Sequence, residues 1–274
     1  MELRGAVVVV TGASSGFGER TALRFARAGS TVVLAARRLE RLEALAARID
    51  GRGGTALAVR CDVTVRGDIE TLRDATLETF GRCNVLVNNA GIAGGGPFHY
   101  VSTEHLERLI ATNLTGLVLG TKAFLPVMLE QGRGHVVNVA SLAGRFATPG
   151  AAVYGATKHG VVAFSEALYH ELHGTGVLVT SVNPGFSPTE GFRARGAPTP
   201  IVVDPDRVAR LIVDVVHRGR APEVSIPRAL AALQVFRVLT PPLYRWGVGT
   251  IARRFGTRPQ PPDRGLHGPS PRKV

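Results

Sequence analysis

The feature that most restricts the fold of this chain is a regular alternation of short apolar runs with helix-like segments over its first 228 residues. The apolar runs are continuous, as in AVVVVTG at 6–12, and such runs are typical of strands buried on both faces. Strands that alternate with helices favour a parallel, doubly wound sheet. We therefore predict the α/β class, with one sheet flanked by helices.

The expected strands share this apolar character and lie at 6–12, 30–38, 55–63, 84–91, 134–141, 177–185 and 222–227. The expected helices lie between them, at 16–28, 39–49, 68–80, 103–131 and 151–173. No repeat and no Pro/Gly-rich linker interrupts residues 1–228, so we expect them to form a single domain.

The composition changes after Pro227. Residues 229–256 are apolar and basic at helical spacing and predict a helical extension, whereas 257–274 are rich in Pro, Gly and Arg and predict disorder. Of the formal net charge of +12, residues 220–274 contribute +8, from ten basic and two acidic side chains. The basic character therefore belongs to the C-terminal end, and the rest of the chain has the charge of an ordinary soluble domain.

Several classes of protein fit this composition poorly. The chain contains no run of 18 apolar residues, so we predict no membrane-spanning helix. The opening MELRGAVVVVTG leaves no room for a secretion signal, and we therefore expect a cytoplasmic protein. Cys61 and Cys83 lack paired spacing and predict buried, reduced thiols, while the histidines lack zinc spacing, so no metal site is expected. The basic tail alone, without aromatic interleaving or a recognition motif, does not predict nucleic-acid binding.

A glycine-rich turn, TGASSGFG at 11–18, closes the first expected strand and opens the first expected helix. Gly12, Gly16 and Gly18 allow a tight turn and a close backbone approach, and the helix N-terminus offers N–H groups to a pyrophosphate. A tight turn without a ligand is the alternative, but the position in the first strand–helix unit favours the dinucleotide site of a Rossmann-type sheet.

The end of the second expected strand indicates which dinucleotide the chain binds. An acidic residue there usually accepts hydrogen bonds from the ribose of NAD, but this chain reads Ala35-Ala36-Arg37-Arg38. A guanidinium matches a phosphate, so Arg37 and Arg38 favour NADP(H). Alternatively, both arginines only begin a charged, solvated helix.

Tyr154 and Lys158 stand four residues apart in YGATKHGVVAF, an otherwise small and apolar segment, and would share one side of a helix. With this pair, the motifs TGASSGFG, CDV at 61–63, NNAG at 88–91, Asn113, Ser141 and NPG at 183–185 resemble the short-chain dehydrogenase/reductase family. The resemblance covers about residues 5–228, with the motifs in the family's order and approximate spacing.

The resemblance implies an oxidoreductase that uses NADP(H) on a carbonyl/secondary alcohol pair. Its implied catalytic residues are Asn113, Ser141, Tyr154 and Lys158. Tyr154 would be the general acid/base, which requires its pKa to fall from about 10 toward ~7, and the nearby Lys158 cation can supply part of that shift. Lys158 would also bind the nicotinamide ribose, Ser141 the substrate oxygen, and Asn113 a water that relays protons. A turn serine or a buried amide are the structural alternatives for Ser141 and Asn113.

The implied cofactor-binding residues line the ends of the strands. They are Gly12, Ser14, Ser15, Gly16, Phe17, Gly18, Arg37, Arg38, Asp62, Val63, Asn89, Ala90, Gly91, Tyr154, Lys158, Pro184, Gly185 and Thr189. Among them, Asp62 would face the adenine and Thr189 the carboxamide or a phosphate.

The chain departs from the family in two places. Phe17 stands where Ile or Leu is more frequent, and the extension after residue 228 replaces the ending of the carrier-protein reductases. We therefore expect a lipophilic small-molecule substrate, with a carrier-protein β-ketoacyl reductase or an inactive nucleotide-binding regulator as alternatives. A homo-dimer or homo-tetramer is expected. The extension would either contact a membrane surface peripherally or pack on the fold or on a partner subunit.

Overall fold

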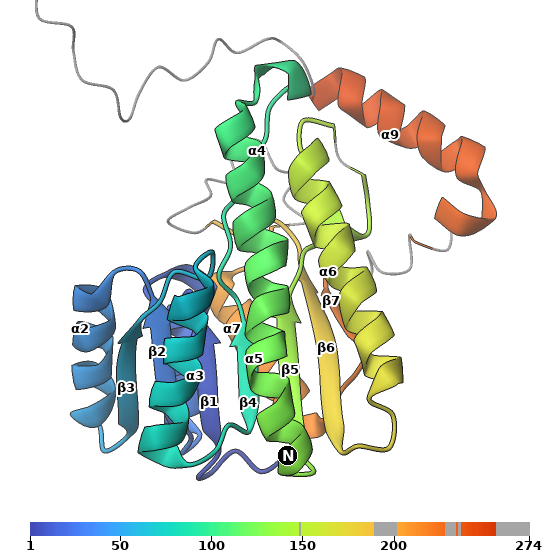
Figure 1. The fold of residues 1–274 in the computed structure, drawn as a ribbon. Helices are drawn as coiled ribbons and strands as arrows, with labels where there is room; N and C mark the ends of the chain where they lie inside the picture. The colour runs from blue at the N-terminus through green and yellow to red at the C-terminus, as the bar shows by residue number, and fades with distance from the viewer. Residues whose placement is uncertain (148, 189–201, 228–233, 235–236, 256–274) are drawn as a thin grey trace, which may run out of the picture.

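A seven-stranded parallel sheet forms the centre of the molecule in the computed structural model (Figure 1), which describes all residues except 148, 189–201, 228–233, 235–236 and 256–274. The strand order is β3-β2-β1-β4-β5-β6-β7. The strands are β1 (Val7–Thr11), β2 (Thr31–Ala36), β3 (Thr55–Arg60), β4 (Val85–Asn88), β5 (Gly134–Val139), β6 (Val177–Pro184) and β7 (Glu223–Ile226). The predicted α/β class and doubly wound sheet are confirmed.

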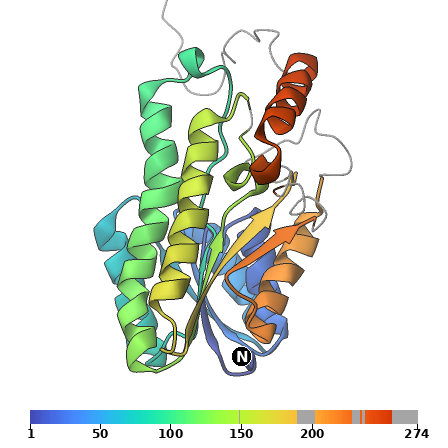
Figure 2. The ribbon, with the colours of Figure 1, turned by 90° about the vertical axis from the view of Figure 1, so that its right-hand side faces the viewer.

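Helices cover both faces of this sheet, as the turned view shows (Figure 2). The helices α1 (Gly16–Arg27), α2 (Leu39–Asp50) and α7 (Pro205–Arg218) lie on one face. The other face carries α3 (Arg66–Phe80), α5 (Gly116–Glu130), which continues from α4 (Thr103–Ile110), and α6 (Ala152–Glu171). Cys61 and Cys83 are buried free thiols, as expected.

The central strand β1 shows why continuous apolar runs were needed. Val8 and Val10 pack with the core that α1, α2 and α7 cover, whereas Val7 and Val9 pack with the core on the opposite face. Successive side chains of a strand point to opposite faces, so a strand with helices on both sides buries every residue. The apolar runs of the sequence are therefore the consequence of two cores that share one sheet.

Two helical predictions were incomplete. No helix was predicted at 205–218, where α7 forms; Asp204 accepts a hydrogen bond from the Asp206 N–H and Pro205 opens the first turn, both ordinary start signals. The helices expected near 103–131 are α4 and α5, and the π-helical turn η2 (Ala111–Thr115) that joins them was not predicted. Such turns re-aim side chains and are frequent at functional sites.

One helical stretch, Thr103–Glu130, is long and apolar enough by composition to cross a membrane, although no such helix was predicted. In the fold this stretch is α4, η2 and α5, and it packs against α3, β4 and β5. Phe124 and Met128 of α5 are fully buried in the core beneath it. The stretch is accounted for as a core helix of the α/β domain.

The C-terminal extension contains α9 (Pro241–Phe255), which lies at the end of the molecule where the parallel strands terminate (Figure 1). The predicted helix within 229–256 is therefore present in part, and the predicted disorder of 257–274 lies outside the described residues.

Candidate active site

The glycine turn between β1 and α1 is held by contacts that exclude side chains. Gly12 and Gly16 have φ of +67° and +61°, in the region that favours glycine. A Cβ added to Gly18 would lie 2.3 Å from the Gly12 carbonyl oxygen, and one added to Gly12 would lie 2.8 Å from Ala90 Cα. The turn therefore needs glycine at these positions, and the Gly16 N-terminus of α1 is left able to receive a pyrophosphate.

The loop after β4 is bonded directly to this turn. Thr11 Oγ1 accepts hydrogen bonds from the N–H groups of Asn89 and Ala90, at 3.0 and 3.1 Å. The Asn89 side chain donates to the Thr11 carbonyl at 2.8 Å. The sequence reasoning assigned Asn89 and Ala90 to the cofactor but missed Thr11, which fixes both of them.

Arg38 lies across the glycine turn. Its Nη2 donates to Ser14 Oγ at 3.0 Å and to Ser15 Oγ at 3.1 Å. A guanidinium and two hydroxyls on one side of a helix N-terminus are donors suited to a phosphate monoester. Arg37 is exposed, and its charge acts on Asp62.

Asp62 follows β3 and is half-buried. Burial acts to raise the pKa of its carboxyl, but hydrogen bonds from Thr64 and the charges of Arg37 and Arg60 outweigh it and hold that pKa below its usual value. The next residue, Val63, is buried, and its carbonyl lies 2.6 Å from where a Cβ on Gly116 would stand. Asp62 is thus an ionised acceptor at the edge of the predicted adenine end.

Four predicted catalytic residues converge from three elements. Tyr154 and Lys158 lie on α6, Ser141 follows β5, and Asn113 lies in η2. Ser141 hydrogen-bonds the Tyr154 hydroxyl, and the Lys158 ammonium lies 5.9 Å from the centre of the Tyr154 ring. A Cβ on Gly91 would lie 3.2 Å from Asn113 Oδ1 and 3.8 Å from Lys158 Nζ, so Gly91 lies close to both of these side chains.

Asn113 does not point freely into the site. Its Oδ1 accepts from the Ile92 N–H at 2.8 Å, and its Nδ2 donates to the Ile92 carbonyl at 2.9 Å. The π-helical turn therefore directs a buried amide at the loop after β4 and fixes that loop. Asn113 is thus a buried amide with both polar atoms hydrogen-bonded, as the structural alternative predicted. Its role in proton relay stays a prediction.

Burial sets the protonation behaviour of the central pair. It lowers the pKa of Lys158, which donates to the Val139 carbonyl at 2.8 Å, to about 8. It raises the pKa of Tyr154, against the opposing effect of the Ser141 hydrogen bond. The expectation that Lys158 already lowers the tyrosine pKa is wrong for this structure, because desolvation of the phenol outweighs an ammonium that is bonded elsewhere.

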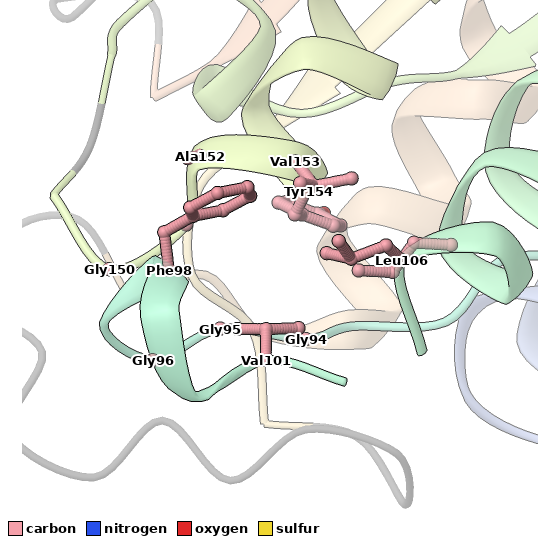
Figure 3. A pocket seen from close by; sticks show the side chains of 12 residues that line it. Gly94, Gly95, Gly96, Phe98, Val101, Leu106, Gly150, Ala152, Val153 and Tyr154 are labelled. Atoms are coloured by element: carbon pink, nitrogen blue, oxygen red, sulfur yellow. The ribbon is translucent and has the colours of Figure 1, made fainter. Parts of the chain in front are cut away.

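A small apolar pocket opens beside Tyr154 (Figure 3). It is lined by Gly94, Gly95, Gly96, Phe98, Val101, Leu106, Leu109, Gly150, Ala151, Ala152, Val153 and Tyr154. The loops at 92–100 and 142–150 both contribute to this lining. Leu106 and Leu109 were not predicted from the sequence, because only the packing of α4 against α6 brings them there.

The remaining predicted cofactor residues lie at the end of β6. Pro184 is the last residue of that strand, and the Gly185 N–H donates to the Ile226 carbonyl at 2.8 Å. Thr189 lies outside the described residues.

Comparison with known proteins agrees with this geometry. The family model described as short chain dehydrogenase matches residues 6–198. An NADP-dependent 3-hydroxy acid dehydrogenase of Salmonella typhi is 45% identical over 180 residues, which are 65% of this chain and 71% of that protein. A 3-oxoacyl-[acyl-carrier-protein] reductase of Synechocystis is 40% identical over 189 residues, 69% of this chain and 76% of that protein.

A solved structure is similar over most of the chain. It is a short-chain dehydrogenase/reductase from Burkholderia phymatum in complex with NAD, with a TM-score of 0.80 and 31% identity. The similarity covers 89% of this chain and 96% of that one. Residues 199–274 lie outside the family model.

Proposed function

The chain belongs to the short-chain dehydrogenase/reductase family, and on that premise we propose that it is an NADP(H)-dependent oxidoreductase acting on a carbonyl/secondary alcohol pair. The observation that carries the proposal is the convergence of four residues: Ser141 and Lys158 lie beside Tyr154, and Lys158 and Asn113 both lie beside Gly91. The glycine turn fits a dinucleotide, since Gly12 and Gly18 leave backbone where side chains would intrude.

The proposed roles follow from position and chemistry. The bound nicotinamide supplies or accepts the hydride, and the protein orients and polarises the substrate. Tyr154 exchanges a proton with the substrate oxygen, and Ser141, already bonded to the Tyr154 hydroxyl, donates to the same oxygen. Lys158 binds the nicotinamide ribose. Asn113 holds the loop that borders the nicotinamide site.

The proposed preference for NADP(H) rests on the arginines after β2. Arg38 with Ser14 and Ser15 offers a guanidinium and two hydroxyls, and Ala36 stands where an NAD site usually has an acid. The Salmonella relative is described as NADP-dependent, whereas the Burkholderia structure holds NAD. Titration with both cofactors tests the preference, and equal affinities would exclude it.

The proposed substrate is lipophilic near its carbonyl. The pocket beside Tyr154 is lined by glycine, alanine and larger apolar side chains, with the tyrosine hydroxyl as its polar group. A 3-oxoacyl group on a carrier protein is the second candidate, favoured by the Synechocystis relative. An inactive nucleotide-binding regulator is the third, and the presence of all four catalytic residue types argues against it.

We place the enzyme in the cytoplasm as a homo-dimer or homo-tetramer, with peripheral membrane contact through the extension at 229–256. Membership of the short-chain dehydrogenase/reductase family supports an oligomer. A monomer in sedimentation measurements would contradict the oligomeric part.

The experiment that tests the proposed function is a substrate panel. Aliphatic and aromatic ketones of increasing length, short 3-oxo acids and a 3-oxoacyl carrier protein are each supplied with NADPH and NADH, and nicotinamide oxidation is followed. The proposal predicts turnover that rises with chain length and is faster with NADPH. Turnover only with the carrier-linked substrate would favour the second candidate, and no turnover with tight NADPH binding would favour the third.

A further inference from the structure

Six large apolar side chains are more than half exposed at one end of the molecule, and we call them the apolar rim. They are Phe98, Tyr100, Val238, Leu239, Leu243 and Trp246. Two belong to η1 (Phe98–Tyr100), which follows β4, and four belong to the C-terminal extension. Figures 1 and 2 both place η1 and α9 at the end where the parallel strands terminate.

The inner side of the extension is already occupied. The Tyr244 ring lies 6.3 Å from the Phe146 ring, and Arg237 donates to the Arg145 carbonyl and lies 3.2 Å from His159 Nε2. These contacts seat the extension on α6 and on the segment that follows Ser141. For its inner side, the structure therefore supports the alternative that the extension packs on the fold.

The outer side has no such contacts among the described residues. Leu243 and Trp246 are three positions apart on α9 and share one face of the helix, beside the exposed Arg245. Phe98 belongs both to the rim and to the lining of the pocket beside Tyr154. Phe98 therefore connects the η1 part of the rim to the proposed substrate pocket.

Charge selects the partner that this surface fits. Residues 228–274 carry nine basic side chains and one acidic side chain. A second copy of the chain docked by the same rim would bring two α9 helices together, each with an exposed Arg245, and is disfavoured by repulsion. A bilayer with anionic headgroups accepts both the apolar side chains and the positive charge.

We propose that the apolar rim docks on an anionic membrane surface, with Trp246 and Leu243 in the headgroup layer and the Tyr154 pocket opening toward the bilayer. Docking itself follows from the surface alone. The consequence that a lipophilic substrate enters from the lipid rests on the proposed function.

Trp246 is the only tryptophan of the chain, so its fluorescence reports on this surface directly. The full-length protein is mixed at low salt with vesicles of phosphatidylcholine alone or with phosphatidylglycerol added. We expect a blue shift of emission and quenching by brominated lipid with the anionic vesicles, and a bound fraction that falls as salt is raised.

A double variant separates docking from general charge attraction. Leu239→Glu with Leu243→Glu keeps the tryptophan, lowers the net charge by two and should reduce vesicle binding at least tenfold. Arg52→Glu lowers the net charge equally at an exposed position after α2 and should bind nearly as well as the wild type. Equal losses in both variants would overturn the role of the rim.

Two further results would overturn the proposal. One is an emission spectrum that anionic vesicles leave unchanged. The other is emission that is already blue-shifted without vesicles and moves to the red on dilution, which would show that a second copy covers the rim. Turnover of a short, water-soluble ketone is measured in parallel with every variant. If that turnover is intact while vesicle binding is absent, the membrane inference fails and the proposed function stands.

Discussion

Around Gly12 and Gly18 backbone atoms pack against backbone atoms, whereas around Phe98 and Trp246 large side chains face outward. The first region belongs to the proposed cofactor side, between β1, α1 and the loop after β4. The second belongs to the substrate side, built from η1, the segment after Ser141 and the extension. A cofactor common to a family requires a fixed shape, while a substrate that differs between members is served by parts outside the sheet. The two sides should therefore respond differently to substitution.

The largest expected effect on the cofactor side is that of Gly18→Ala. The added Cβ would stand 2.3 Å from the Gly12 carbonyl oxygen, and backbone cannot yield there cheaply. We expect NADPH affinity to fall at least a hundredfold, measured by calorimetry. The control is Gly67→Ala, where a Cβ meets nothing within 4 Å. Similar affinity in both variants would show that the tight packing is not required.

Lys158→Met tests how much folding stability is lost by burying the Lys158 charge between the cofactor side and the substrate side. The Lys158 pKa of about 8 lies below its value in the unfolded chain, so the unfolded state binds more protons between about pH 8 and 10. Stability of the wild type should therefore rise with pH in this window. The variant should lack this rise and be more stable near pH 7 by about 1–3 kcal/mol, yet inactive. Chemical denaturation at several pH values measures the difference, and parallel pH profiles would contradict the assignment.

Arg38→Ala should change cofactor preference without disturbing the fold. Loss of charge-assisted hydrogen bonds to a phosphate costs about 1.5–3 kcal/mol, so NADP(H) affinity should fall roughly ten- to a hundredfold. Binding of NAD(H) should stay within about twofold, and Arg37→Ala should give a smaller change in the same direction. Arg48→Ala, on α2 and paired with Glu19, serves as the control. Equal weakening for both cofactors would point to a structural role for Arg38.

The smallest expected effect lies on the substrate side, at Arg237. Arg237→Ala removes the contacts of this side chain to the Arg145 carbonyl and to His159. The variant should loosen the segment after Ser141 and raise KM for the ketone about threefold. Cofactor affinity and kcat should stay close to wild type, and Arg237→Lys should recover part of the loss. A fall in kcat with an unchanged KM would place Arg237 in the chemistry instead.

The cofactor side could be predicted from sequence because its signals are local. A continuous apolar strand, three glycines at fixed spacing and the absence of an acid at Ala36 each act within a few residues, and the observed turn agrees with them. The substrate side could not. Leu106 and Leu109 reach the pocket only through the packing of α4 against α6, and the π-helical turn that aims Asn113 has no local signature.

The direction of the Tyr154 pKa shift could not be predicted from the sequence either. The spacing of Tyr154 and Lys158 places a cation near the phenol, but whether its charge or burial prevails depends on the depth of the site and on what the ammonium bonds. Here the ammonium donates to Val139, and burial prevails. Helix α7, in contrast, was detectable from Asp204 and Pro205 and was overlooked.

The most direct test of the account is single-turnover hydride transfer by Tyr154→Phe, which keeps the ring and removes only the hydroxyl. The variant is saturated with NADPH, mixed with the best ketone of the panel, and compared with the wild type and with Tyr169→Phe, on the same helix away from the pocket. We predict that transfer falls about a hundred- to ten-thousandfold while NADPH affinity stays within about threefold, since general acid catalysis is worth about 10²–10⁴. Transfer within tenfold of the wild type, with NADPH still bound, would contradict the assignment of Tyr154 as the proton donor and with it the proposed reaction at this site.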